Sequence, residues 1–386
     1  MLWEATAADA SPQDHDLCCE SPYDASISGQ SSPAESSASD SDSCYVMGSP
    51  RTPVAAWGPS KSSVDALEQE RDYAEHLREM ELSNRVEPDY MSRHARAPGG
   101  APLAPTARAS AVDWMVDGAW QLGISNDALC LGVALLDRYL AARARAGAAA
   151  AAAAGARLPL VAATCLWVAA KYEHMQAPPL DMFSRCLLHN AYPAAAFLEM
   201  EADLLTAVDY RLASITTAKT FLRRIMFDLG ELEAKAGSKV DEALYFLTSY
   251  LVECSLLEYG LLSAPPSRVA GAALVLAHAL LGRPLGAARL EALTGCAAAE
   301  LTAPLRWLRQ VHAVLSQAGG LYAVTVKYQS PEMARVAAVP AILGLADGRL
   351  AAAAPPPPAA PAAPPAACAA GRRAAAPVAA AAVVVA

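Results

Sequence analysis

The residue types that usually carry out catalysis or bind metals are scattered along this sequence. Its seven histidines include no His-x-x-x-His pair, and its nine cysteines include no Cys-x-x-Cys pair. No glycine-rich loop follows a strand-like segment, so a phosphate-binding loop is not predicted. Glu199 and Glu201 lie on opposite sides of a predicted helix and cannot act together as acid and base. These patterns predict a protein that is not an enzyme and that needs no metal or other cofactor.

The net charge is −9, and most of it lies near the N-terminus. Residues 1–62 hold nine acidic and two basic residues, which leaves −2 for the rest of the chain. Proteins that bind DNA or RNA usually present a basic surface to the phosphates. The near-neutral remainder offers no such surface, so we expect no direct nucleic-acid partner.

The cysteines and the lack of targeting segments predict the cellular location. An odd number of cysteines without paired spacing is typical of reduced thiols rather than of a secreted disulfide framework. No secretory signal is seen, and the small-residue tract 378–386 is too short to span a membrane. We expect a protein of the nucleus and cytoplasm with no membrane partner.

Helical periodicity begins near Ser63, ahead of the main apolar part of the chain. Tyr73, Leu77 and Met80 share one face of a helix that has charged residues opposite, and Pro88 ends the pattern. A short amphipathic helix in this position is expected to dock on the following domain or on a partner.

The middle of the chain, about 107–320, predicts consecutive helices joined by short loops, as in a helical bundle. Ser125 or Asn126 can cap a helix that continues to Tyr139. Pro159 can open the next helix.

That helix ends near Lys171, and a third long helix covers 192–210. The segment 322–328 is the only weak candidate for a strand. The sequence therefore predicts an all-α fold.

An internal repeat lies within this region. Residues 161–169 match residues 269–277 position by position in their small residues, Val, Leu and closing Ala. Each copy follows a Leu-rich segment, 126–139 or 240–257, and chance similarity between two Ala-rich helices is the alternative. Small residues on a helix let its neighbours approach closely, which suits a central helix of a bundle.

Low-complexity tracts lie outside the predicted core. The tract 147–155 is almost pure alanine, which favours helix but offers no large apolar face, so we expect a surface insertion between two helices. Residues 1–62 are rich in Ser, Asp and Pro, and residues 341–386 are rich in Ala and Pro. Both tails are expected to be disordered.

Several motifs, in their order along the chain, resemble those of the cyclins, the activating subunits of cyclin-dependent protein kinases. They include Leu-Arg-Glu-Met-Glu at 77–81, Val-Asp-Trp at 112–114, Leu-Leu-Asp-Arg-Tyr-Leu at 135–140, Val-Ala-Ala-Lys-Tyr-Glu at 168–173, Leu-Glu-Met-Glu at 198–201 and Tyr-Leu-Val-Glu at 250–253. The resemblance covers about 65–340 and is to A- and B-type mitotic cyclins. It implies a tandem cyclin-box fold of two five-helix bundles that binds a kinase and has no catalysis of its own.

The resemblance also implies a kinase-binding site. The family uses a Lys at the end of its third helix and a Glu in its fifth, which here are Lys171 and Glu201. A cation and an anion at neighbouring helix ends can orient a partner helix. Apolar contacts around them are expected from these residues: Tyr172, Leu205, Tyr210 and Leu212. Ordinary solvated charges and ordinary core residues are the alternatives.

Two further features follow from the resemblance. Arg108 and Asp137 match a structural ion pair that ties the first helix of the box to the second. A groove that reads Arg-x-Leu peptides in the family is degraded here, because Ala107, Ser110 and Ala111 replace the Met, Ile and Leu that usually line it. Its remaining members are Trp114, Asp117 and Leu158, with Pro159 in place of a Gln.

The sequence thus predicts a regulatory subunit that binds and activates a cyclin-dependent Ser/Thr kinase in cell-cycle control, with protein substrates or regulators as further partners. A cyclin-fold transcription factor or scaffold without such a kinase is the first alternative, and an all-α enzyme is the second. The expected domains are a tail at 1–62, an N-terminal helix and linker at 63–106, two cyclin boxes at 107–212 and 213–340, and a second tail at 341–386.

Overall fold

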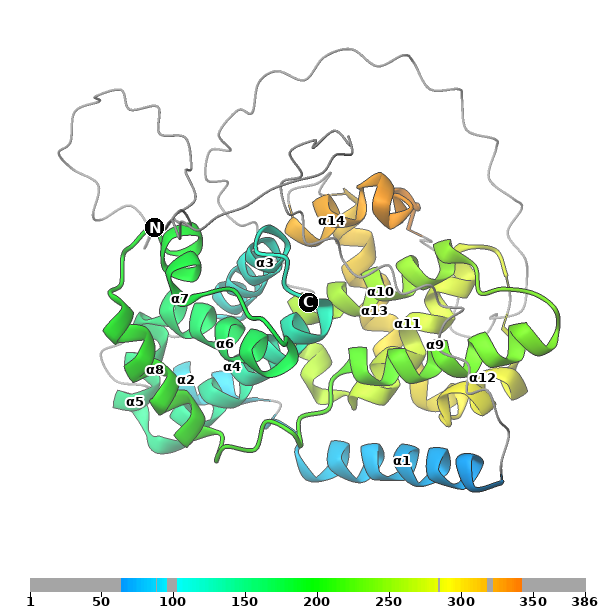
Figure 1. Ribbon diagram of the computed structural model, residues 1–386, viewed down its shortest axis with the longest axis horizontal. Coiled ribbons are helices and arrows are strands. Elements are labelled where there is room, and N and C mark those ends of the chain that lie inside the picture. The colour runs from blue at the N-terminus through cyan, green and yellow to red at the C-terminus, as the bar shows by residue number, and fades with distance from the viewer. Residues whose placement is uncertain (1–63, 88, 96–102, 284, 318–321, 342–386) are drawn as a thin grey trace, which may run out of the picture. The chain divides into compact units, whose positions relative to one another are not determined.

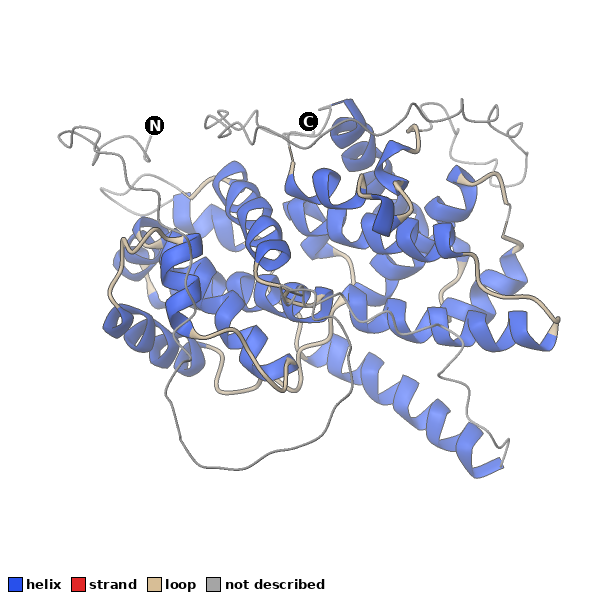
Figure 2. Cartoon of the chain, turned by 45° about the horizontal axis from the view of Figure 1, so that its top comes forward, coloured by secondary structure: helices blue, strands red, loops and turns tan. Residues whose placement is uncertain are grey.

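The computed structural model describes residues 64–87, 89–95, 103–283, 285–317 and 322–341 (Figure 1). Helices make up the regular structure of these residues, and no strand occurs among them (Figure 2). The all-α prediction is therefore confirmed. The expected disordered tails lie outside the described residues. The α-helices are α1 (Val64–Ser83), α2 (Tyr90–Ala95), α3 (Pro105–Gln121), α4 (Asn126–Ala146), α5 (Ala148–Ala156), α6 (Leu158–Glu173), α7 (Leu180–Met182), α8 (Ala194–Ala207), α9 (Ala218–Lys235), α10 (Glu242–Leu257), α11 (Pro266–Leu280), α12 (Ala287–Thr294), α13 (Thr302–Gln317) and α14 (Ala323–Tyr328).

The first bundle is built around α6, which packs against α3, α4 and α8. Pro159 lies in the first turn of α6, as its fixed φ favours, and residues 160–170 are all buried. The closest approach is to α4 at Gly132, where a Cβ would lie 3.2 Å from the Cα of Leu166. Gly132 therefore allows two helix backbones to meet with no side chain between them.

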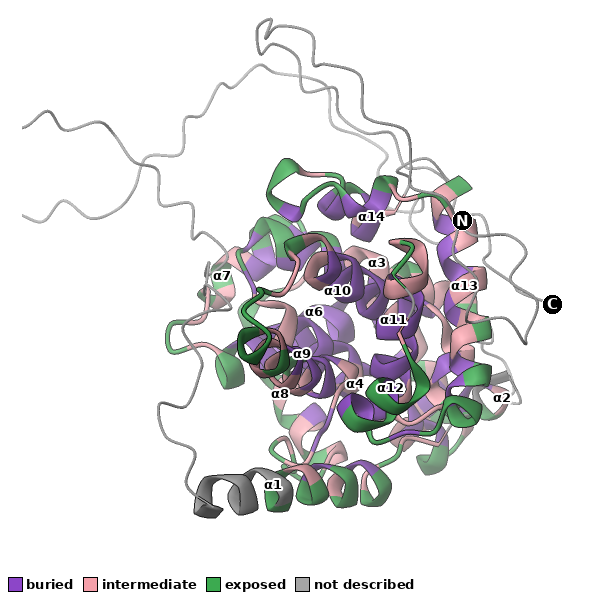
Figure 3. Cartoon of the chain, turned by 90° about the vertical axis from the view of Figure 1, so that its right-hand side faces the viewer, coloured by how far each residue is buried: buried purple, intermediate pink, exposed green. Residues whose placement is uncertain are grey.

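The second bundle repeats this plan around α11, which packs against α9, α10 and α13. Residues 269–277 are buried, as their counterparts 161–169 in α6 are (Figure 3). The repeat in the sequence is therefore a structural repeat, with a small-residue helix at the centre of each bundle. Ser125 caps α4, Thr217 caps α9 and Asp241 caps α10.

Helix α1 docks on the second bundle. Leu77 is buried, and the Nη2 atom of Arg78 donates to the Thr294 carbonyl at 3.0 Å. The Glu81 carboxylate accepts hydrogen bonds from the backbone N–H of Ser267 at 2.5 Å and from its hydroxyl at 2.8 Å. Glu81 thus caps the N-terminus of α11 from outside the bundle, where a negative charge is favoured.

A buried polar network joins the two bundles through α14. Lys327 Nζ lies 2.8 Å from Glu253 on α10 and 2.7 Å from Asn126 on α4. Tyr328 donates its hydroxyl to Glu253, and Asp113 on α3 accepts the N–H of Ala323 at 2.9 Å. The one strand candidate, 322–328, forms helix α14 from Ala323 onward, and these contacts hold the helix to both bundles.

Two expected helix boundaries move for local reasons. Helix α4 continues beyond Tyr139 to Ala146 and stops only at Gly147, whose φ of 121° suits glycine. Helix α8 is shorter than 192–210, because Pro193 precedes its first turn and Asp209 and Tyr210 adopt left-handed conformations.

The alanine tract is a helix rather than a loop. Helix α5 lies between α4 and α6, as the position of an insertion requires, and it also contacts α2. Ala151 and Ala154 are buried, while Ala149 and Ala153 are exposed. The sequence predicts a surface insertion here, and two alanines of α5 also pack, because their small side chains let the helix lie close to its neighbours.

Candidate functional site

Lys171 and Glu201 lie together at the surface of the first bundle. Lys171 stands in the last turn of α6, where the helix emerges from the core, and Glu201 lies in the middle of α8. The Lys171 ammonium forms an ion pair with Glu201 Oε1. Their side chains keep exposed fractions of 36% and 20%, so Glu201 is less exposed than the sequence suggested. The pair is accessible, yet each member is already oriented by the other.

The Lys171 ammonium also contacts an aromatic ring of the core. Lys171 Nζ lies 3.5 Å from the centroid of the Trp167 ring, a cation–π distance. Trp167 in turn packs edge-to-face on Phe197 of α8, with the ring centroids 6.5 Å apart. Trp167 and Phe197 are buried, so they fix the position of the ammonium group.

Large apolar side chains on α6, on α8 and in the segment after α8 remain open to solvent. Tyr172 is 50% exposed, Leu198 54% and Tyr210 67%. Leu205 and Leu212 are half-buried and pack against the core on one side. We call this surface the Lys171 face; it consists of Lys171, Tyr172, Leu198, Glu201, Leu205, Tyr210 and Leu212. Exposed large apolar groups are typical of interaction surfaces.

The backbone at Tyr210 is held in an unfavourable conformation. Asp209 and Tyr210 have φ values of 56° and 55°, which side chains with a Cβ rarely adopt. The N–H of Tyr210 donates to the Leu205 carbonyl at 2.9 Å and so fixes the turn. Strain of this type costs about 1–3 kcal/mol and is found mainly at functional sites. Here it presents the Tyr210 ring to solvent.

The end of α6 is also tied to α4. The Nε2 atom of His174 accepts the backbone N–H of Ser125 at 3.0 Å, just before α4 begins. Burial lowers the pKa of His174, in agreement with a neutral ring that accepts a hydrogen bond. The hydrogen bond restrains His174, which is the residue directly after the exposed end of α6 at Lys171, Tyr172 and Glu173.

Arg108 and Asp137 form a buried pair with two hydrogen bonds. Arg108 Nε lies 2.6 Å from Asp137 Oδ1, and Nη2 lies 2.8 Å from Oδ2. Tyr90 donates its hydroxyl to Asp137 at 2.8 Å, and Arg108 donates to the Leu256 carbonyl of α10 at 2.8 Å. Burial opposes the charge on Arg108, but the Asp137 carboxylate raises the pKa of Arg108 above its ordinary value. The pair links α3 and α4 to α2 and to the second bundle.

The surface of α3 holds the residues expected to form a weakened peptide groove. Ala107, Ala111 and Trp114 are half-buried, whereas Ser110 and Asp117 are exposed. Asp117 accepts a hydrogen bond from Gln121 at 2.7 Å. Leu158 is buried at the start of α6, a helix that packs on α3. The three small side chains at 107, 110 and 111 leave Trp114 as the one large apolar group of this set on α3.

The described residues can also be considered for metal and membrane sites. The described part of the chain contains no group of three or more His, Cys, Asp or Glu side chains placed to hold a metal ion. Among these residues no single helix is both long and apolar enough for a membrane span. Only α5 and α6 pass that test together, across a bend of 80°.

Comparison with known proteins identifies the family. A model described as "Cyclin, N-terminal domain" matches residues 72–213, and one described as "Cyclin, C-terminal domain" matches residues 216–342. The chain belongs to the cyclin family. The first bundle of this cyclin lies within the first match, and the second bundle lies within the second.

Individual proteins are similar to parts of this chain. This cyclin is 36% identical to Cyclin-A1-2 of Oryza sativa subsp. japonica over 53% of its own length and 39% of that protein. It is 29% identical to the G2/mitotic-specific cyclin-B2 of Gallus gallus over 70% of its length and 61% of that protein. The crystal structure of a viral cyclin from herpesvirus saimiri matches with a TM-score of 0.48 and 16% identity, over 61% of this chain and 95% of that one. The chain spans less than half the length of the A1-type relatives it matches.

Sequence reasoning did not assign Leu198 and Trp167 to the site. Leu198 precedes Glu201 by three residues and Leu205 follows it by four, a spacing that places the three on one face of α8. That spacing could have identified Leu198 as part of the site. Trp167 lies inside an unbroken apolar run, and nothing in that run indicates its contact with Lys171.

Proposed function

We propose that this cyclin binds and activates a cyclin-dependent Ser/Thr protein kinase in cell-cycle control. The observation that carries the proposal is the Lys171 face, where an oriented ion pair stands among exposed Tyr and Leu side chains. Its membership of the cyclin family supports the choice of a kinase as partner. We place its action in the nucleus and cytoplasm, without direct nucleic-acid or membrane contacts.

The ion pair suits recognition of a partner helix. The Lys171 ammonium has three hydrogens, and its bond to Glu201 leaves others for carbonyl groups of a partner. Glu201 Oε2 can accept from a donor of the same partner, while the surrounding Tyr and Leu side chains lose water on contact. The charges fix orientation and the apolar ring supplies affinity, the usual division of labour in an interface.

Activation would follow from differential binding. A subunit that binds the active kinase conformation more tightly than the inactive one shifts the population toward activity. The chemistry of phosphoryl transfer then belongs to the kinase, which holds the metal ions and the catalytic Asp. We propose accordingly that this chain contributes no catalytic group and is not itself an enzyme.

The experiment is a kinase pull-down from cell extract, followed by assay of the captured kinase. We expect Lys171→Ala with Glu201→Ala to weaken kinase binding by about 30-fold or more, because breaking a desolvated charge contact costs about 2–5 kcal/mol. The exposed pair should contribute less than about 1 kcal/mol to the stability of the free chain.

The matched control is a second surface ion pair, Arg268–Glu300, whose side chains are each 40% exposed on the second bundle. Arg268→Ala with Glu300→Ala should leave kinase binding unchanged. Normal binding by the Lys171 and Glu201 double variant would refute the proposed interface. Failure of the wild-type chain to capture any kinase would instead favour a scaffold or transcription factor role.

Substrate choice is proposed to depend on another surface or on the kinase. A buried side chain the size of Met, Ile or Leu contributes about 1.5–3 kcal/mol, and three such groups are missing at Ala107, Ser110 and Ala111. We expect weak binding of a labelled Arg-x-Leu peptide in fluorescence anisotropy, and a gain in the triple variant Ala107→Met, Ser110→Ile, Ala111→Leu. Tight binding by the unchanged chain would contradict this expectation.

A further inference from the structure

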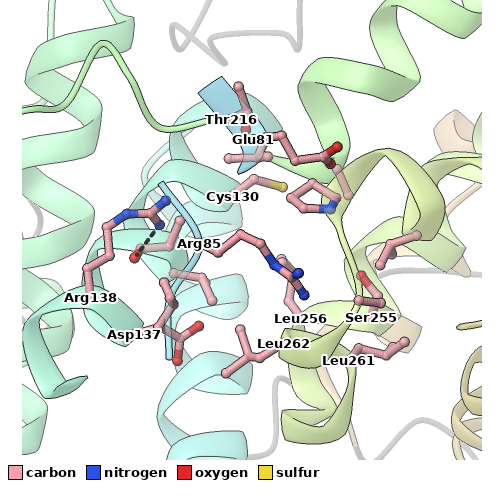
Figure 4. Close-up of a pocket in the computed structure, with 18 of the residues that line it drawn as sticks. Glu81, Arg85, Cys130, Asp137, Arg138, Thr216, Ser255, Leu256, Leu261 and Leu262 are labelled. Carbon is pink, nitrogen blue, oxygen red and sulfur yellow. Dashed lines mark hydrogen bonds between the residues drawn. The ribbon is translucent and has the colours of Figure 1, made fainter. Parts of the chain in front are cut away.

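A cavity of about 130 Å³ lies where the two bundles meet α1. Its apolar wall includes Leu256, Leu261 and Leu262, from α10 and the 3-10 turn that follows it (Figure 4). Arg138 enters from α4, and Arg85 extends from the end of α1 (Figure 4). The cavity is thus walled by segments that are far apart in the sequence.

The three acidic residues of the wall already have partners. Asp137 is bonded to Arg108 and Tyr90. Glu81 accepts two hydrogen bonds at the start of α11, and Glu258 accepts the N–H of Gly260 at 2.9 Å. None of these carboxylates forms an ion pair with Arg85 or Arg138 in the described part of the chain.

Neither arginine therefore has an ion-pair partner among the described residues, although the nearby Asp137 carboxylate partly offsets the charge of Arg138. Arg138 donates to the carbonyls of Ala134 at 3.2 Å and Asn84 at 2.7 Å, and Arg85 donates to that of Ser263 at 2.5 Å. Burial lowers the pKa of Arg138 to about 10, which still leaves it charged at neutral pH. Arg138 is partly withdrawn from water, which is costly for a cation, and a bound anion would lower that cost; Arg85 is exposed at the rim.

We propose that this cavity binds a small organic monoanion, a carboxylate on a compact apolar body of about the size of one ring. The volume is similar to that of an apolar cavity of about 150 Å³ that accepts benzene. Guanidinium groups bind carboxylates with two parallel hydrogen bonds, and the leucine wall suits an apolar body. The nearby Asp137, Glu81 and Glu258 charges favour a monoanion over doubly charged phosphate.

A ligand in this position would touch α1, the first bundle and the second bundle at once. It would therefore stabilise their packing and raise the melting temperature, since it binds the folded chain only. The site is separate from the Lys171 face, because its lining residues belong to other surfaces. The proposal holds or fails independently of the proposed kinase partner.

The test uses the full chain and benzoate as the probe, measured by isothermal titration calorimetry and by melting temperature. We expect saturable binding with a Kd on the order of 0.1–1 mM, as for other ligands of this size. Benzamide, which has the same shape without the charge, and inorganic phosphate should each bind at least about tenfold more weakly, since a charge-assisted hydrogen bond is worth about one such factor. Equal binding of benzoate and benzamide would overturn the assignment of an anion.

Variants localise the binding. Arg85→Met changes an exposed rim residue and should weaken benzoate binding about tenfold, while Ala264→Phe should abolish it by filling the cavity. Arg93→Met is the matched control, because Arg93 is an exposed arginine of α2 outside the cavity. Arg138→Met should abolish binding too, and if it does not fold, the Arg85 and Ala264 variants still decide. Unchanged binding in both, or no binding by the wild type, would refute the site.

Discussion

The two bundles have similar central helices, and they differ at the ends of those helices. Helix α6 ends in Lys171, Tyr172 and Glu173, which leave the core and face solvent. Helix α11 ends in His278, Ala279 and Leu280, which stay half-buried. The repeated small residues therefore build both cores, whereas the first bundle alone exposes charged and aromatic side chains at this point. The two central helices therefore differ in what their ends present to solvent and not in the repeat.

Each bundle also contains a buried ion pair. Asp137 on α4 pairs with Arg108 and accepts a Tyr90 hydroxyl, and Glu253 on α10 pairs with Lys327 and accepts a Tyr328 hydroxyl. In each bundle the acid lies on the helix that precedes the central one. Each pair also contacts the other bundle, through the Leu256 carbonyl in one case and Asn126 in the other.

The largest effects are expected from breaking these pairs. Asp137→Ala and Glu253→Ala should each lower the free energy of unfolding by about 3–5 kcal/mol, because each strands a buried cation. Urea denaturation measures the loss. As a control, Asp203→Ala breaks the more exposed pair with Arg143 and should cost about 1 kcal/mol or less. A small effect at one buried acid only would show that the two pairs are not equivalent.

The alanine helix α5 offers a second contrast, because the second bundle has only a short 3-10 turn (Tyr259–Ser263) between the corresponding helices. Ala151→Gly with Ala154→Gly should cost about 2–3 kcal/mol, since each change loses helix propensity of about 1 kcal/mol together with packing. The exposed pair Ala149→Gly with Ala153→Gly loses propensity alone and should cost about 1–2 kcal/mol. Equal losses in thermal unfolding would mean that α5 does not pack.

Asp113 should make the contact between α3 and α14 sensitive to pH. Burial raises the pKa of Asp113 from 3.8 to about 6, against the opposing effect of its bond to the Ala323 N–H. The folded state therefore binds the proton more tightly, and this stabilisation is complete below about pH 4 and lost as the pH rises through about 6. Asp113→Asn keeps an acceptor without the charge, so it should be more stable than wild type by about 1–2 kcal/mol at pH 8.

The check on Asp113 is a series of melting temperatures between about pH 4 and pH 8, where linkage predicts that the curves converge at the acid end. A lower melting temperature for Asp113→Asn at every pH would show that the carboxylate charge stabilises the contact. His312→Gln is a suitable comparison in the second bundle. Burial lowers the pKa of His312 to about 4, so the imidazole of the wild type should destabilise the folded state on acidification, the opposite of the Asp113 effect.

The smallest contrast concerns two helix glycines. A Cβ at Gly132 would lie 3.2 Å from a backbone atom of α6, whereas at Gly271 it would lie 3.2 Å from the end of the Leu301 side chain. Backbone cannot move aside as a side chain can, so Gly132→Ala should destabilise by about 1 kcal/mol despite its gain in helix propensity. Gly271→Ala should be neutral or stabilising by up to about 1 kcal/mol. The reverse order in urea denaturation would contradict the packing described here.

The sequence by itself determined the helical class, the repeat and the positions of Lys171 and Glu201. Local signals carry this information: Pro159 opens α6, Ser125 caps α4, and the run of small apolar residues at 161–169 requires burial on every side. Such signals act within one turn of a helix or along one face, and they can be read without knowing what packs against them.

The tertiary structure alone decided what lies between distant segments. It pairs Lys171 with Glu201, turns 322–328 into a helix held by Asp113, and packs the alanine tract against α4. It also brings Arg85 and Arg138 to one cavity, although nothing in the local sequence distinguishes either residue from an ordinary solvated cation. These outcomes depend on contacts across many residues, and the energy of a charge or a small side chain depends on its surroundings rather than on its neighbours in sequence.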